Sequence, residues 1–198
     1  MPTAGKGRTK ESRPTTTQEG RVRVFSYGAN MNGAVLRRRN VRAITSVPAV
    51  LRGYAFSYRH RGGYGTITPL PTGEVLGVVQ EFSLADFETL KEKEKGYRVV
   101  TLRVCGIGND AWPHDVLAFT TPPSALLRSE PSPLCRYMDV VISGARESGL
   151  PETYVSDNLE REACVPAREA AHYDVPSVRY GIAALLVAAM VGFVRLCL

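Results

Sequence analysis

The chain has 198 residues, enough for one domain of ordinary size with extra residues at its ends. Apolar residues make up 44% of it and charged residues 22%, which excludes a fully disordered chain, a collagen and a coiled-coil rod. The formal net charge of +6 is mildly basic. It is compatible with nucleic acid, an anionic membrane surface or a small acidic molecule, and it selects none of them.

The N-terminal segment 1–20 contains no Val, Ile, Leu, Phe or Tyr, so we expect it to be disordered. Apolar alternation and turn residues then predict a domain over 21–160. Its expected strands lie at 21–27, 47–58 (one or two), 75–82, 98–105 and 115–120, and its expected helices near 31–39, at 84–95, at 133–148 and just after Pro151. Strands and helices do not alternate regularly. This mixture predicts an α+β domain around a mostly antiparallel or mixed sheet, which can close as a small barrel.

The helix expected at 84–95 places a carboxylate on its apolar side. Ser83 is the predicted N-cap, and Leu84, Phe87 and Leu90 form an apolar stripe at helical spacing. Glu94 falls in the same stripe. A charge there is unfavourable unless it is paired or has a chemical task. The alternative is that Glu94 ends the helix and contacts solvent, and periodicity alone does not decide between these two interpretations.

The far end of the chain is strongly apolar. Residues 181–194 carry no polar side chain, and Arg195 follows them. Fourteen helical residues rise about 21 Å, against roughly 30 Å for the hydrocarbon core of a membrane. We expect 161–178 to be a polar linker and 179–198 to form a hydrophobic helix. That helix would anchor the protein in an intracellular membrane, with the domain facing the cytoplasm. The alternative is a terminal helix buried in the core or in a dimer.

The cysteines and histidines are scattered along the chain and form no C-x-x-C pair or metal-ligand spacing. They are Cys105, Cys135, Cys164 and Cys197, with His60, His114 and His172. We therefore expect neither a disulfide scaffold nor a structural zinc site. An apolar stretch near the N-terminus is also missing, so we expect no secretory signal and a reducing compartment.

Four segments, in this order, resemble the γ-glutamylcyclotransferases. They are FSYGANMN at 25–32, GGYGTITPLPTGEVLGVV at 62–79, LKEKEKGY at 90–97 and PSPLCRYMDVVISGARESGLPETY at 131–154. Each motif alone is loose, but the four together with compatible spacing are specific. The resemblance implies a small mixed β-barrel with flanking helices. It also implies intramolecular aminolysis, in which the α-amine of a γ-glutamyl substrate attacks its own γ-carbonyl carbon and 5-oxoproline forms.

The same resemblance implies the residues of the site. Glu94 matches the family's catalytic glutamate, which acts first as base and then as acid. The expected substrate-binding residues are Phe25, Ser26, Tyr27, Gly28, Ala29, Asn30 and Tyr137. No metal or cofactor is implied. Three residues depart from the family pattern: Ala29 stands in place of the commoner serine, Lys91 in place of an aspartate and Lys95 in place of a glycine.

Other functions stay open at this point. One is a cyclotransferase for γ-glutamylamines, although Asn30 argues against the loop of that group. Another is a non-catalytic, membrane-tethered module that binds γ-glutamyl compounds. Nucleic-acid binding through Arg37, Arg38, Arg39 and Arg42 is not expected, because a run of arginines on a short helix is usually a solvated face. The sequence leaves the oligomeric state open, a homodimer included.

Overall fold

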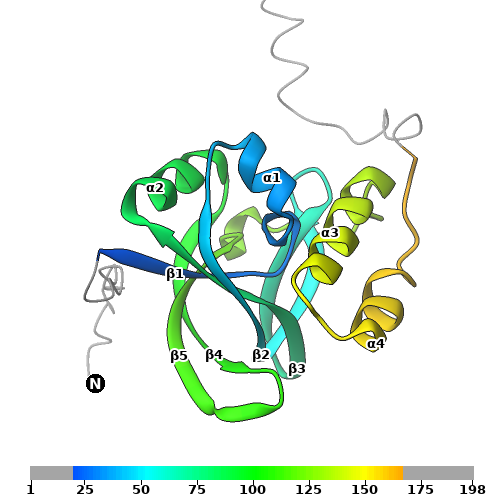
Figure 1. The fold of residues 1–198 in the computed structure, drawn as a ribbon. Helices are drawn as coiled ribbons and strands as arrows, with labels where there is room; N and C mark the ends of the chain where they lie inside the picture. Colours follow the sequence, from blue (N-terminus) through cyan, green and yellow to red (C-terminus); the bar gives the residue numbers. More distant parts are fainter. Residues whose placement is uncertain (1–19, 167–198) are drawn as a thin grey trace, which may run out of the picture.

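The computed structural model describes residues 20–166, without the side chains of 109–114. Five strands close into a barrel in the order β1-β3-β2-β4-β5 (Figure 1). They are β1 (Arg21–Ser26), β2 (Ala43–His60), β3 (Tyr64–Ser83), β4 (Arg98–Gly106) and β5 (Asn109–Thr120). Strands β1 and β5 pair in parallel, and the other neighbours pair antiparallel. This confirms the predicted α+β class, the mixed sheet and its closure.

Helices cover the barrel at one end and along one side. They are the 3-10 turn η1 (Ala29–Met31), α1 (Gly33–Arg38), α2 (Leu84–Lys93), the 3-10 turn η2 (Pro123–Ala125), α3 (Cys135–Glu147), α4 (Glu152–Tyr154) and the π-turn η3 (Val155–Leu159). In Figure 1, α1 and α2 lie near one end of the barrel and α3 and α4 flank its side. The elements therefore follow the predicted order, with shifted ends.

The hairpin β2–β3 is longer than the sequence predicts. The strands have 18 and 20 residues, and the turn between them contains Gly62 and Gly63, both with positive φ. The prolines and the glycine at 69–73 are accommodated where the pairing register shifts between Arg52 and Tyr54, because a proline without an N–H is tolerated at an irregularity in the ladder.

The second half of strand β1 is buried on both faces, and this fixes where the chain leaves it. Val22 and Val24 pack in a cluster with Phe87 and Leu90 of α2, whereas Phe25 packs in the barrel interior. Successive side chains of a strand point to opposite faces, so β1 joins the two clusters. Its end therefore delivers the loop after Ser26 to the protein interior.

Helix α2 is capped as predicted and ends one residue before the predicted carboxylate. The Ser83 hydroxyl accepts a hydrogen bond from the Asp86 N–H at 3.1 Å. Leu90 is fully buried, but Leu84 is 48% exposed, so the predicted apolar stripe is wrong at its first position. Glu94 is the C-cap, with φ −86° and ψ 56°, and is not a helical residue. Gly96, with φ +88°, then turns the chain towards β4.

Helix α3 packs very closely on the turn after β1. A Cβ atom placed on Gly144 would lie 2.6 Å from the backbone nitrogen of Asn32. Real Cβ atoms do not approach backbone so closely, so a glycine is required there. The close contact fixes α3, and with it the tyrosine near its start, relative to the loop that follows β1.

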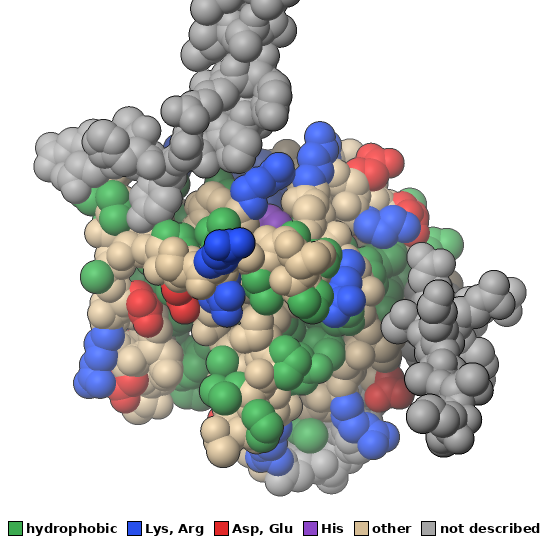
Figure 2. Space-filling view, turned by 180° about the vertical axis from the view of Figure 1, so that it is seen from behind, with side chains coloured by type: hydrophobic (Ala, Val, Ile, Leu, Met, Phe, Trp, Pro, Cys, Tyr) green, Lys and Arg blue, Asp and Glu red, His purple; other side chains and the backbone are tan. Residues whose placement is uncertain are grey.

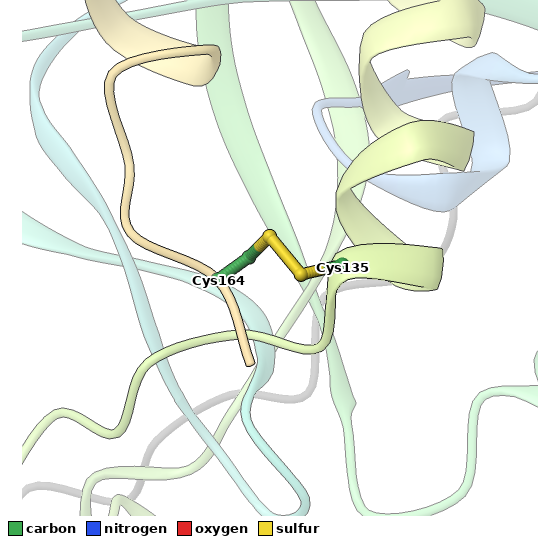
Figure 3. Close-up of a disulfide and its surroundings, with 2 residues drawn as sticks. All are labelled: Cys135 and Cys164. Carbon is green, nitrogen blue, oxygen red and sulfur yellow. A yellow bond between two sulfur atoms is a disulfide. The ribbon is translucent and has the colours of Figure 1, made fainter. Parts of the chain in front are cut away.

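The expectation that the cysteines form no disulfide is wrong. Cys135 at the start of α3 is bonded to Cys164, with their Cα atoms 4.8 Å apart (Figure 3). Spacing of 29 residues gives no signal in the sequence. The backbone brings the pair together, because the Cys135 N–H donates to the Val165 carbonyl and the Val165 N–H donates to the Pro133 carbonyl. The first residues of the expected linker are thereby attached to α3.

Both chain ends lie outside the described residues. They include the segment 1–19, expected to be disordered, and the apolar tail expected as a membrane anchor. Within residues 20–166, no helix has the length and apolar character needed to cross a membrane.

We expect the double variant Cys135→Ser/Cys164→Ser to lower the free energy of unfolding by about 2–4 kcal/mol, because a cross-link of this span restricts the unfolded chain. Urea unfolding without reductant measures the change. Cys105→Ser is the control, since Cys105 is a free cysteine. Dithiothreitol should bring wild type to the level of the double variant. Equal midpoints of wild type and double variant without reductant would contradict the prediction.

Candidate active site

One cavity of about 340 Å³ lies at the end of β1 and gathers all the predicted site residues. Its predicted lining residues are Phe25, Ser26, Tyr27, Gly28, Ala29, Asn30, Glu94 and Tyr137. They come from β1, the following loop, the end of α2 and α3. The volume is of the size that small-molecule sites have in proteins.

A three-residue cluster holds the carboxylate of Glu94, whose side chain is 9% exposed. Arg39 forms an ion pair with Glu94 Oε1, and the Asn30 side-chain amide donates to the same oxygen at 3.0 Å. Arg39 also donates to Asn30 Oδ1 at 2.7 Å. Burial removes water from the carboxylate, and these two donors supply the hydrogen bonds and the opposite charge that replace it.

Both donors bind Oε1, and the second carboxylate oxygen, Glu94 Oε2, has no hydrogen-bond partner among the residues whose side chains the structure describes. One oxygen thus positions the carboxylate and the other is left for a molecule in the cavity. The three lysines near Glu94 in sequence do not supply its partner. Lys91 instead pairs with Glu88.

The sequence did not identify Arg39 as part of this site. It was expected on a solvated face together with Arg37 and Arg38, and for Arg39 that expectation is wrong. Arg39 is the C-cap of α1 and its side chain is only 28% exposed. Its partner is 55 residues away in sequence, and no local pattern indicates such a contact.

The loop after β1 is held by Gln80 of β3, a buried residue that the sequence also did not single out. Gln80 accepts a hydrogen bond from the Ser26 hydroxyl at 2.8 Å and donates to the Asn30 carbonyl at 3.2 Å. The backbone N–H groups of Gly28, Ala29 and Asn30 make no hydrogen bond within the described part of the chain. Three adjacent donors are therefore available at the cavity.

Tyr137 of α3 reaches the cavity beside that loop. Its hydroxyl accepts from the Gly65 N–H at 3.0 Å, and a Cβ on Gly28 would lie 3.0 Å from the same oxygen. The hydroxyl proton has no acceptor among the described residues. Burial raises the pKa of Tyr137 far above its ordinary value, so the phenol stays protonated and can donate.

His60, at the end of β2, forms another wall of the cavity. Its ring stacks on Tyr97 at 3.8 Å, and its Nδ1 lies 2.8 Å from the Thr121 hydroxyl. Burial, with the neighbouring charge of Arg61, lowers the pKa of His60 below its ordinary value. The folded protein therefore favours the neutral imidazole.

Comparisons with known proteins agree with this architecture. The model of the AIG2-like family matches residues 74–157. A γ-glutamylcyclotransferase of Mus musculus is 30% identical in an alignment 143 residues long that covers 66% of this chain and 73% of the mouse protein. An uncharacterised protein of Homo sapiens has a TM-score of 0.64 at 22% identity, over 74% of this chain and 90% of that one. A structure described as a γ-glutamyl cyclotransferase has a TM-score of 0.61 at 20% identity, over 73% and 89% of the two chains.

The protein is a closed mixed β-barrel with one little-exposed carboxylate in a cavity of small-molecule size. The chain belongs to the γ-glutamylcyclotransferase family, within the AIG2-like proteins. The likeness to the solved structures concerns the fold, and the family assignment depends on the mouse relative.

We expect Arg39→Ala to lower the free energy of unfolding by about 1–3 kcal/mol, because it leaves the buried Glu94 carboxylate without its charged partner. Chemical denaturation measures the change. Arg38→Ala is the matched control, since Arg38 is exposed and forms no ion pair with a described residue. Adding Glu94→Gln to Arg39→Ala should recover part of the loss. A loss equal to that of Arg38→Ala would show that the pair does not stabilise the fold.

The lowered pKa of His60 predicts a pH dependence of stability. The unfolded histidine titrates near 6.5 and the folded one below it. The unfolded state therefore binds more protons below about pH 6.5, so stability is fully present above that pH and falls as the pH approaches the folded pKa. Between pH 7 and 5, His60→Gln should lose less unfolding free energy than wild type in urea titrations. An equal change in unfolding free energy with pH for the two proteins would refute this.

Proposed function

We propose that this protein is a γ-glutamylcyclotransferase that converts γ-glutamyl amino acids or dipeptides to 5-oxoproline and a free amino acid. One observation carries the proposal. A single cavity contains a carboxylate with one oxygen, and three backbone N–H groups, that make no hydrogen bond within the described part of the chain. They can serve as a base and as a set of donors for a developing negative charge. Ring closure needs both, and it requires no second reactant.

In the proposed mechanism, Glu94 Oε2 accepts a proton from the α-ammonium of the substrate. The free amine then attacks the γ-carbonyl carbon, and a tetrahedral intermediate forms with the new C–N bond. Glu94 gives that proton to the leaving nitrogen and takes the second proton of the attacking nitrogen, and the old C–N bond breaks as the carbonyl re-forms. The second proton then passes to the released amine, which leaves as an ammonium. One carboxylate can do all these steps because each proton that it takes from the attacking nitrogen is one that the leaving nitrogen needs. Arg39 and Asn30 are positioning residues, since they hold Oε1 and leave Oε2 available.

The loop after β1 would hold the glutamyl part. The N–H groups of Gly28, Ala29 and Asn30 would bind its carboxylate or the oxygen of the γ-carbonyl as negative charge develops there. These are backbone contacts, so the replacement of serine by Ala29 leaves them intact. The Tyr137 hydroxyl would donate its unused proton to the substrate. Phe25, Ser26 and Tyr27 would form the wall behind it.

Proximity explains why so few groups are needed. The nucleophile and the electrophile belong to one molecule, and a cavity that keeps the glutamyl chain folded makes the step effectively unimolecular. The free-energy barrier then depends mainly on deprotonation of the ammonium and on stabilisation of the oxyanion. Both tasks fall to groups that line this cavity.

The two alternatives differ from this proposal in substrate or in turnover. A γ-glutamylamine cyclotransferase would use the same ring closure on a different leaving amine. A membrane-tethered binding module would keep the cavity without turnover. The domain limits 21–160, the linker 161–178 and the cytoplasm-facing tail anchor at 179–198 stay predictions, as does the oligomeric state.

The deciding experiment is release of 5-oxoproline from γ-glutamyl-alanine by wild type and by Glu94→Gln. We expect the variant to lose a factor of roughly 100–10,000 in turnover, because an amide cannot exchange the proton. The matched control is Glu92→Gln, an exposed neighbour two residues away. Its activity should equal that of wild type.

The outcomes separate the candidate functions. Equal activity of wild type and Glu94→Gln would exclude Glu94 as the base. If a folded wild type releases no product from γ-glutamyl amino acids but turns over γ-glutamylamines, the amine alternative is correct. Binding of γ-glutamyl-alanine without product from either compound class would favour the binding module.

A further inference from the structure

The cavity has a buried inner part and an exposed mouth. Phe25, Ser26 and Phe119, all nearly inaccessible to solvent, line the inner part. Arg61, Lys93 and Lys95 are exposed and line the same cavity at its mouth.

The mouth is cationic and its charges are not neutralised locally. Arg61, Lys93 and Lys95 form no ion pair with any residue whose side chain the structure describes, whereas Lys91, which shares α2 with Lys93, pairs with Glu88. Glu94 is the only acidic residue among those that line the cavity, and Arg39 already neutralises it. On the face shown in Figure 2, Lys and Arg side chains gather on several sides of the visible histidine.

We propose that Arg61, Lys93 and Lys95 form a subsite for carboxylates of the part of the substrate that is released. The preferred substrates are then γ-glutamyl conjugates of acidic amino acids, whose released part carries a side-chain carboxylate besides its α-carboxylate. This inference rests on the proposed function, since it takes the orientation of the substrate from that chemistry.

The orientation follows from the position of the reacting groups. Glu94 Oε2 and the N–H groups of the loop act on the glutamyl part, so that part occupies the buried end. The released amino acid lies beyond the bond that breaks and extends towards the mouth. Its α-carboxylate can contact one cation there, and a side-chain carboxylate can contact a second.

The same charges disfavour a cationic leaving group. A γ-glutamyl conjugate of a polyamine, or one joined to the ε-amine of lysine, would bring an ammonium close to three cations. Like charges in contact raise the free energy of the complex. The mouth therefore favours γ-glutamyl amino acids over γ-glutamylamines as substrates. The buried end does not distinguish them, because the glutamyl part is the same in both.

A matched series of substrates tests the subsite. γ-Glutamyl-glutamate, γ-glutamyl-glutamine and γ-glutamyl-lysine, the last joined through the lysine α-amine, have similar size and differ in side-chain charge. For wild type, we expect kcat/KM for 5-oxoproline release to fall in that order, by roughly three- to tenfold from glutamate to glutamine, as exposed charge pairs allow. The difference should shrink in 0.5 M salt, because the mouth is open to solvent.

Variants assign the effect to the mouth. Lys93→Gln/Lys95→Gln, with or without Arg61→Gln, should lower kcat/KM for γ-glutamyl-glutamate towards the value for γ-glutamyl-glutamine, mainly through KM. The glutamine conjugate should change little. Lys91→Gln is the matched control, since Lys91 does not line the cavity, and it should keep the wild-type ratio.

A binding measurement separates this inference from the proposed function. Calorimetry with Glu94→Gln compares the affinities for γ-glutamyl-glutamate and γ-glutamyl-glutamine without turnover. Tighter binding of the glutamate conjugate, reduced by the lysine variants, supports the subsite even if wild type forms no product. The lack of product would overturn only the proposed function. Product formed with equal kcat/KM for the two conjugates, equal affinities, or no binding of either conjugate would overturn the subsite.

Discussion

The ion pair between Arg39 and Glu94 is the constraint on which the cavity depends. It joins the end of α1 to the end of α2, two segments 55 residues apart, at the point where both meet the loop after β1. Asn30 of that loop binds both partners. A carboxylate so little exposed is tolerated only with a charged partner, so the position of each of the three residues depends on the other two. The pairing also leaves one carboxylate oxygen for the cavity, which links the stability of the site to its chemistry.

A second set of contacts positions the cavity walls relative to the barrel. Gln80 of β3 holds the loop by hydrogen bonds to Ser26 and to the Asn30 carbonyl. Gly65 at the start of β3 joins two tyrosines, donating to Tyr137 and accepting from Tyr97 at 2.7 Å. Gly144 lets α3 approach the turn after β1 closely. The disulfide fastens the start of α3, two residues before Tyr137. The cavity is thus built from strand, helix and loop contacts that are distant in sequence, which favours a rigid site of defined shape.

The cavity combines two electrostatic environments within a short distance. At its buried end, one anion is balanced by Arg39 and faces uncharged donors. At its mouth, cations face solvent without partners among the described residues. In the proposed function, general acid–base chemistry uses the first environment, where burial strengthens hydrogen bonds. The inferred recognition of the released part uses the second, where the charges are exposed to solvent and screened by salt. The functional proposals assign one task to each.

The sequence by itself determined the order of the strands and helices, because the spacing of apolar residues, the helix cap at Ser83 and the glycines in turns are local signals. Its motif order also indicated the family and the residues that line the cavity. Only the tertiary structure decided what those residues contact. Arg39 belongs to a run of arginines typical of a solvated face, and Cys135 and Cys164 show no telling spacing, yet each is paired. Such partners depend on how the closed barrel brings separate segments together. A contact between residues that are distant in sequence leaves no pattern in the spacing of neighbouring residues.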